Sequence, residues 1–201
     1  MYAEQIELQT SRFLLVVIGP PGVGKTAFTY ELQERIPYCQ IVSKDEIASR
    51  YLHGRHLYTP EDEAYYLERY RGPIYAQARR EIDCLLFFGP VVFDVTHRLE
   101  RENEGWENPY REIAEMHGIP LFCIELYTPQ EILWQRLEQR PIQPAFYDLS
   151  TKTGRLRFVQ DWLTNPSKLP ADCGREIDNS GSLSVAVNQA LTFITSFALP
   201  Q

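Results

Sequence analysis

Residues 13–26, FLLVVIGPPGVGKT, decide the fold. Residues 13–18 form a continuous apolar run, which is typical of a strand covered on both faces in a parallel sheet. The segment from Gly19 to Thr26 then matches the pattern G-x-x-x-x-G-K-[ST] without a mismatch. A helical pattern follows at once, up to Arg35 and ahead of Pro37. The segment therefore predicts a strand, a phosphate-binding loop and a helix in direct succession.

Each part of this loop suits the binding of a nucleoside triphosphate. Glycines let backbone N–H groups turn inward around an anion, and the following helix offers the positive end of its dipole. We expect Lys25 to reach the β- and γ-phosphate oxygens and the hydroxyl of Thr26 to bind Mg²⁺. A glycine-rich turn with an exposed lysine is the alternative. The predicted ATP-binding residues of the loop are Gly22, Val23, Gly24, Lys25, Thr26 and Ala27.

Strand and helix patterns alternate along the rest of the chain. Further strands are predicted at residues 39–42, 91–94, 121–126 and 175–177. Helices are predicted at residues 45–52, 59–87, 110–117, 129–140 and 182–197, with a break near Gly72-Pro73 left open. Such alternation requires crossover connections, which give an α/β fold with helices on both faces of a parallel sheet. With 201 residues, the chain suits one domain, residues 1–201.

Residues 141–168 differ from the regular pattern, because they are polar, contain several prolines and show weak periodicity. We interpret them as a lid with one short helix near residues 157–163. Arg136 and Arg140 precede the lid and lie four residues apart, on one helix face. An arginine that neutralises the transferring phosphoryl group is worth ~10³–10⁵ in rate, so both are candidate catalytic residues and Arg136 also a nucleotide-binding one. A solvated helix face beside Glu138 is the alternative.

Asp94 ends the apolar strand VVFD, at the sheet edge where the phosphates are expected. A carboxylate at this place can hold Mg²⁺ directly or through water, so Thr26 and Asp94 are the predicted metal residues. The alternative is that Asp94 caps the next helix. His97, three residues later, is interpreted as a packing or substrate-edge residue and not as a base.

Charge and cysteine content narrow the class of protein and its partners. The net charge of −7 disfavours a protein that coats nucleic acid, since such binding depends on neutralising phosphates. The four cysteines form no C-x-x-C pair, which disfavours a zinc site and fits a reducing, cytoplasmic location. The sequence starts without a signal-peptide pattern, and its apolar runs are too short to span a bilayer.

Taken in order, the motifs resemble the P-loop kinases of the zeta-toxin, polynucleotide-kinase and adenylate-kinase-like group. They are GPPGVGKT, SKDE, VVFDVTH, RLEQR and EIDNSGS, and the resemblance covers residues 13–195. It implies a P-loop NTPase three-layer sandwich whose five-stranded parallel sheet has the order 2-3-1-4-5, with ATP and Mg²⁺ as ligands and an arginine-bearing lid.

The resemblance also assigns roles to individual residues. Polynucleotide kinases carry an acid after the second strand that approaches the acceptor hydroxyl, and Asp45 matches it. The arginine that commonly follows three residues later is Ala48 here, which leaves the type of acceptor open. The family places adenine near the loop after the last strand, which implies Asn179, Ser180 and Gly181. The alternative for Asp45 is a cap of the next helix.

The expected function is an ATP-dependent phosphotransferase that moves the γ-phosphoryl group to a hydroxyl of a small molecule, nucleoside or nucleotide. A polynucleotide 5′-hydroxyl kinase and a nucleotide-binding switch with slow ATP hydrolysis are the alternatives; the acidic charge and Ala48 weigh against the first. The acceptor is expected between residues 45–75 and the lid. Tyrosines in that stretch either stack on the acceptor or pack helices; they are Tyr51, Tyr58, Tyr65, Tyr66, Tyr70 and Tyr75.

Overall fold

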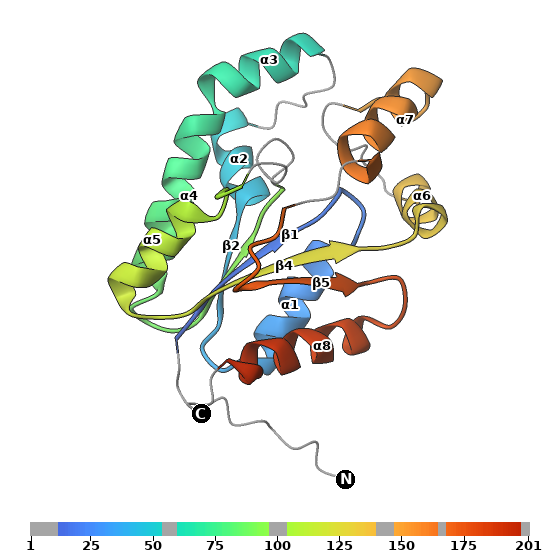
Figure 1. Ribbon diagram of the computed structural model, residues 1–201. Helices are drawn as coiled ribbons and strands as arrows, with labels where there is room; N and C mark the ends of the chain where they lie inside the picture. The colour runs from blue at the N-terminus through green and yellow to red at the C-terminus, as the bar shows by residue number, and fades with distance from the viewer. Residues whose placement is uncertain (1–11, 54–59, 97–103, 140–146, 165–167, 198–201) are drawn as a thin grey trace.

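The computed structural model describes residues 12–53, 60–96, 104–139, 147–164 and 168–197 (Figure 1). Within these ranges, five parallel strands form one sheet in the order β2-β3-β1-β4-β5, which confirms the order that the resemblance implied. The strands are β1 (Leu14–Ile18), β2 (Gln40–Ser43), β3 (Val91–Asp94), β4 (Leu121–Tyr127) and β5 (Gly174–Asp178).

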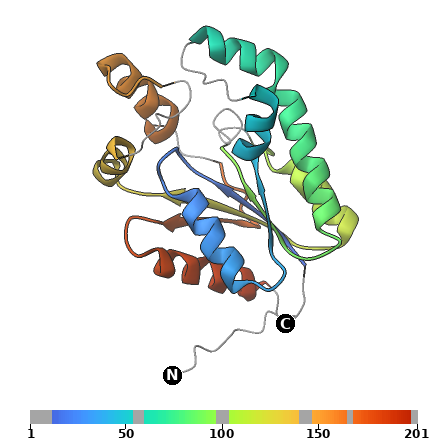
Figure 2. The same ribbon diagram turned by 180° about the vertical axis from the view of Figure 1, so that it is seen from behind.

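Helices cover both faces of the sheet, as the alternating pattern predicted. They are α1 (Lys25–Arg35), α2 (Lys44–Leu52), α3 (Pro60–Arg69), α4 (Arg71–Leu85), α5 (Asn108–His117), α6 (Gln130–Glu138), α7 (Lys152–Val159) and α8 (Leu183–Ser196), with a π-helical turn, η1, at Gln160–Thr164. Two views show α1 and α8 on one face and α4 and α5 on the other (Figure 1 and Figure 2). No helix in the described part of the chain is both long and apolar enough to cross a membrane.

The central strand β1 accounts for the apolar run at residues 13–18. Its side chains alternate between two buried clusters, because successive strand residues point to opposite faces. Leu15 and Val17 join the cluster under α1 and α8, whereas Leu14, Val16 and Ile18 join the cluster under α4 and α5. All five are fully buried, so β1 carries no polar side chain and ends directly at the glycine loop.

The strand register brings distant sequence motifs to one edge. Val17 lies opposite Asp94, and Ser43 lies opposite Asp94 on the other side of β3. On the far side of β1, Tyr127 lies opposite Asp178. Because all strands are parallel, their carboxyl ends meet at this edge.

Two helical segments differ from the sequence prediction. The break left open near Gly72-Pro73 in the predicted helix 59–87 is present two residues earlier, because α3 and α4 meet at Tyr70. Pro73 lies in the first turn of α4, where a missing N–H costs no intrahelical bond. The lid helix begins at Lys152 and not near residue 157, because the Thr151 side chain accepts a hydrogen bond from Gly154 N and caps it. The predicted cap at Thr59 lies outside the described residues.

Candidate active site

The glycine loop between β1 and α1 adopts a conformation that requires glycine. Gly22 and Gly24 have φ values of +89° and +100°, in the left-handed region. A Cβ at Gly24 would lie 2.7 Å from Asn179 Nδ2, which itself is fixed in the wall of the loop. Val23 N donates to Pro20 O at 3.3 Å and closes the loop on itself. The loop is therefore a preformed ring of backbone at the start of α1, the geometry expected of an anion site.

Lys25 lies across this loop. Its side chain is buried, with the residue 9 % exposed, and Nζ donates to Gly19 O at 2.9 Å and to Pro20 O at 3.2 Å. A buried ammonium group on the inner side of the loop disfavours the alternative of a glycine-rich turn with an exposed lysine.

Thr26 and Asp94 meet beside Lys25, although they are far apart in sequence. Thr26 Oγ1 donates to Asp94 Oδ2 at 3.1 Å. Asp94 is 8 % exposed; burial raises its pKa, while the positive charge of Lys25 lowers it. A hydroxyl and a carboxylate side by side are oxygen ligands of the type that Mg²⁺ prefers, so these residues fit the predicted ion. In the described residues the next helix, α5, begins only at Asn108, so Asp94 does not cap it.

Arg136 and Asn179 join the loop from the other side of β1. Arg136 Nη1 donates to Val23 O at 3.0 Å and Nη2 donates to Asn179 O at 2.8 Å. Asn179 is 4 % exposed, and its Nδ2 donates to the same Val23 O at 2.8 Å. Arg136 thus holds two predicted nucleotide-binding segments together, and the alternative of a solvated helix face is wrong for it. Arg140 lies outside the described residues.

The loop after β5 is held through hydrogen bonds that its backbone N–H groups donate. Asn179 N donates to Tyr127 O at 2.8 Å, and Ser180 N donates to the Asp178 carboxylate at 2.8 Å. A Cβ at Gly181 would meet no heavy atom within 4 Å, so the loop is open at this point. Asn179 therefore supports the glycine loop, while Gly181 lies beside open space.

Asp45 lies at the carboxyl edge of the sheet and does not cap α2. The cap is Ser43, whose Oγ accepts from Glu46 N at 3.3 Å. Asp45 lies just past the end of β2, with β3 between its strand and the glycine loop, and its side chain is 77 % exposed. Lys44 Nζ donates to Asp45 Oδ1 at 2.7 Å. The carboxylate is therefore open to a ligand at the same edge as the loop.

Comparison with known proteins agrees with this geometry. A family model described as "AAA domain" matches residues 14–153. The chain belongs to this family of P-loop kinases. No curated protein matches the sequence.

Solved structures with the same fold include several small-molecule kinases. A sugar kinase from Janibacter sp. is 19 % identical with a TM-score of 0.59, over 92 % of this chain and 95 % of that one. A gluconokinase from Sinorhizobium meliloti is 19 % identical with a TM-score of 0.60, over 94 % of each chain. A shikimate kinase from Bacteroides thetaiotaomicron is 11 % identical with a TM-score of 0.57, over 91 % of this chain and 98 % of that one. At these identities the similarity shows the P-loop kinase fold.

Residues 147–164, the described part of the predicted lid, contain buried aromatic side chains that were not predicted as core residues. Phe158 is fully buried, with its ring centre 5.3 Å from Trp134 on α6 and 5.2 Å from Tyr147. Trp162 Nε1 donates to Tyr147 Oη at 3.1 Å. Phe158 and Trp162 both lie in the short helix predicted near residues 157–163, but the polar composition of the segment concealed that they are buried. On the acceptor side, Arg157 forms an ion pair with the largely buried Glu63 of α3.

The tyrosines of the acceptor segment mostly pack helices. Tyr66 is 7 % exposed and belongs to the core, and Tyr51 and Tyr70 pack against the same cluster. Tyr75 donates from Oη to Thr96 O at 3.3 Å, and burial raises the pKa of Tyr75 to about 12, so the phenol remains a donor. Tyr58 and His97 lie outside the described residues.

Removing the bridge between the two nucleotide-binding segments is expected to weaken nucleotide binding. Arg136→Gln loses two charge-assisted hydrogen bonds to backbone oxygens, each worth ~1.5–3 kcal/mol. We expect about tenfold weaker binding of ADP with Mg²⁺ by calorimetry, since part of this free energy preorganises the loop. Arg80→Gln, an exposed site on α4, is the matched control. Equal affinities in the two variants would contradict the role of Arg136.

Proposed function

We propose that this P-loop kinase is an ATP-dependent phosphotransferase that moves the γ-phosphoryl group to a hydroxyl of a small molecule, nucleoside or nucleotide. The contact between Thr26 and Asp94, next to the buried Lys25, carries the proposal. It places a hydroxyl, a carboxylate and an ammonium group at the open end of a preformed anion site. These are the groups needed to hold a metal-bound triphosphate in position for transfer.

The nucleotide would be held by three parts of the chain. The backbone of residues 22–27 and Lys25 would bind the phosphates, and Thr26 and Asp94 would hold Mg²⁺, which supplies neutralisation of the phosphate charge. Adenine would lie near Asn179, Ser180 and Gly181, beside the guanidinium group of Arg136. This arrangement is supported by the hydrogen bonds that join Arg136, Asn179 and Val23. We keep Arg136 and Arg140 as candidate catalytic cations.

The acceptor would bind between Asp45 and the γ-phosphate. Support comes from the exposed carboxylate of Asp45, one strand away from the loop. The names of the structural neighbours, sugar kinase, gluconokinase and shikimate kinase, favour a small acceptor over a polynucleotide. So does the net charge of −7. We also propose a reducing, cytoplasmic location, because all four cysteines are free.

A turnover screen tests the function. ADP formation from ATP and Mg²⁺ is measured with sugars, sugar acids, nucleosides, nucleotides, antibiotics and a 5′-hydroxyl oligonucleotide, with product phosphorylation checked by mass spectrometry. The proposal expects strong stimulation by at least one small alcohol. Stimulation by the oligonucleotide alone would identify a polynucleotide kinase. Slow ADP release that no compound stimulates would identify a switch and overturn the proposal.

We further propose that residues 141–168 form a lid within a single domain, residues 1–201, and that the lid becomes ordered when ATP binds. Because Tyr147, Phe158 and Trp162 are packed together, the described part should move as one unit about its ends. We expect slower amide exchange across residues 147–164 when a non-hydrolysable ATP analogue is added. Exchange in α8 is the internal reference. Equal exchange of the lid with and without the analogue would contradict the prediction.

A further inference from the structure

Lys44 is a buried cation next to the proposed acceptor carboxylate. Its side chain is only 16 % exposed, and its ammonium group donates to Asp45 at 2.7 Å. Burial by itself lowers the pKa of Lys44, but the charge of Asp45 and the oxygens of Tyr66 and Tyr75 outweigh it and raise the pKa above its ordinary value. Lys44 is therefore positively charged at neutral pH, among groups from α2, α3 and α4.

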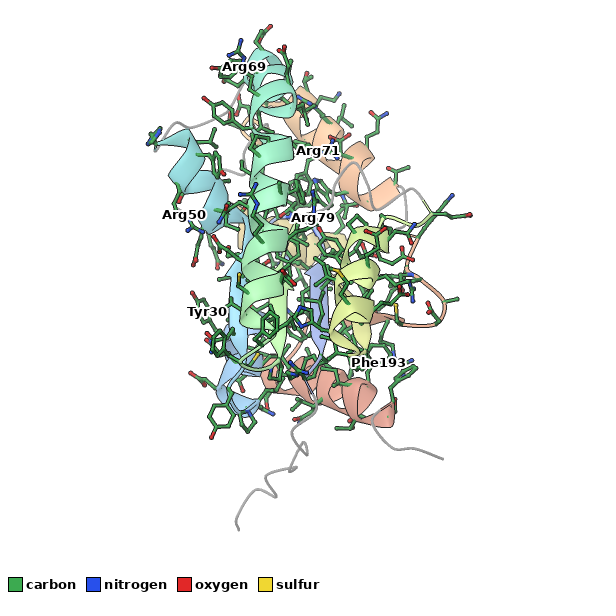
Figure 3. All side chains as sticks on the ribbon, turned by 90° about the vertical axis from the view of Figure 1, so that its left-hand side faces the viewer. Tyr30, Arg50, Arg69, Arg71, Arg79 and Phe193 are labelled. Carbon is green, nitrogen blue, oxygen red and sulfur yellow. The ribbon has the colours of Figure 1, made fainter. Side chains whose placement is uncertain are left out.

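Arg71 adds a second cation from α4. It begins this helix, one turn ahead of Tyr75, and its guanidinium carbon lies 5.9 Å from the centre of the Tyr75 ring. Tyr75 in turn donates to the carbonyl oxygen of Thr96, two residues past Asp94. Figure 3 shows Arg71 at the N-terminal end of α4, with Arg79 farther along the same helix. These contacts tie Arg71 to the strand edge that carries Asp94.

Lys44 and Arg71 come from elements on the β2–β3 side of β1: Lys44 begins α2 directly after β2, and Arg71 begins α4, which packs against β2 and β3. Lys44 and Arg71 both act on Tyr75. Lys44 beside Asp45 and Arg71 at the Tyr75 ring therefore add positive charge on this side of β1, apart from Lys25 at the glycine loop.

We propose that the acceptor carries a second, anionic group, a carboxylate or a phosphate, and that Arg71 binds this anion with the help of Lys44 while the acceptor hydroxyl faces Asp45. The inference rests on the proposed function. In the proposed function Lys25 and Asp94 serve ATP and Mg²⁺, while Lys44 contacts Asp45 and Arg71 lies over the Tyr75 ring, on the side proposed for the acceptor. The guanidinium fork matches the paired oxygens of a carboxylate or phosphate, and the Tyr75 ring restrains it. A neutral sugar or nucleoside has no anionic group to pair with this guanidinium group.

Paired acceptors test this inference. We would compare glucose with gluconate and glucose 6-phosphate, glycerol with glycerate and glycerol 3-phosphate, and each nucleoside with its 5′-monophosphate. The proteins are wild type, Arg71→Gln, Lys44→Gln and Arg80→Gln. Arg80 is an exposed cation nine residues after Arg71, on the opposite side of α4, and is the matched control. Circular dichroism melts show whether each variant is folded.

We expect anionic members to be turned over at least about tenfold better than their neutral partners. In Arg71→Gln, kcat/KM for the anionic members should fall about 10–100-fold, mainly through KM, with a much smaller loss for neutral members. In Lys44→Gln, kcat/KM should likewise fall more for anionic than for neutral acceptors. Arg80→Gln should behave as wild type. A preference for the carboxylates or for the phosphates shows which of the two anionic groups the acceptor carries.

Failure of the inference and failure of the proposed function give different results. Equal turnover of charged and neutral members, or equal losses for both in Arg71→Gln, would overturn the anion site and leave the kinase assignment intact. If no compound stimulates turnover, calorimetry of the anionic compounds with the protein loaded with ADP and Mg²⁺ decides the matter. Binding that Arg71→Gln weakens supports the anion site, and absence of binding, or equal binding to wild type and Arg71→Gln, overturns it.

Discussion

Lys25→Ala is expected to abolish phosphoryl transfer and to leave the fold intact. Lys25 is 9 % exposed, and its ammonium group lies across the glycine loop, at 2.9 Å from Gly19 O. A cation that neutralises the transferring phosphoryl group is worth ~10³–10⁵ in rate, so we expect kcat to fall by about 10³-fold or more. The fold should survive because the core clusters of the sheet contain no part of Lys25.

Three measurements separate a catalytic loss from a folding defect. Single-turnover kinetics gives the loss in phosphoryl transfer, calorimetry gives the affinity for ATP, and a circular dichroism melt gives the stability. Lys152→Ala, at an exposed position in the first turn of α7, is the matched control and should behave as wild type. An unchanged kcat in Lys25→Ala would overturn the assignment of the loop.

The sequence predicted the central strand and the loop well, because each is governed by local rules. Val16 and Val17 must be apolar when both faces of β1 are covered, and Gly24 must be glycine at φ +100°. Asp94 could be predicted for the same reason, since a strand in a parallel sheet delivers its last residue to the ligand edge. The strand order itself came from the resemblance and not from the residues.

Other parts depend on tertiary contacts that no local pattern encodes. The convergence of Arg136 and Asn179 on Val23 O joins three segments, and only the fold shows which partner each side chain takes. The sequence of the predicted lid looked polar because most of its residues lie at the surface and are polar. Its packing depends on Tyr147 and Phe158, which are far apart in the segment. Their contact with each other and with α6 requires the folded chain.

Asp45→Asn is expected to lower acceptor-dependent kcat while ATP affinity is largely preserved. Ser43 caps α2, so the substitution leaves the cap intact. The ion pair with Lys44 is lost, and because the Lys44 side chain is only 16 % exposed, circular dichroism melts of Asp45→Asn and wild type are compared and rates are measured where both are folded. A change in rate would therefore report on the acceptor step and not on stability. Glu46→Gln, the next residue in the same first turn, is the matched control.

The size of the loss distinguishes a base from a positioning group. General-base catalysis typically contributes ~10²–10⁴-fold to the rate. If the Asp45 carboxylate only orients the hydroxyl, its loss should lower kcat by ~10²-fold or less. Phosphoryl transfer passes through a loose transition state that needs little activation of the acceptor, which favours orientation by Asp45. A base role also predicts an acidic limb in the pH–rate profile that disappears in Asp45→Asn, whereas orientation by a neutral amide would preserve part of the rate at every pH. Transfer at the wild-type rate by Asp45→Asn would show that this carboxylate takes no part in the acceptor step.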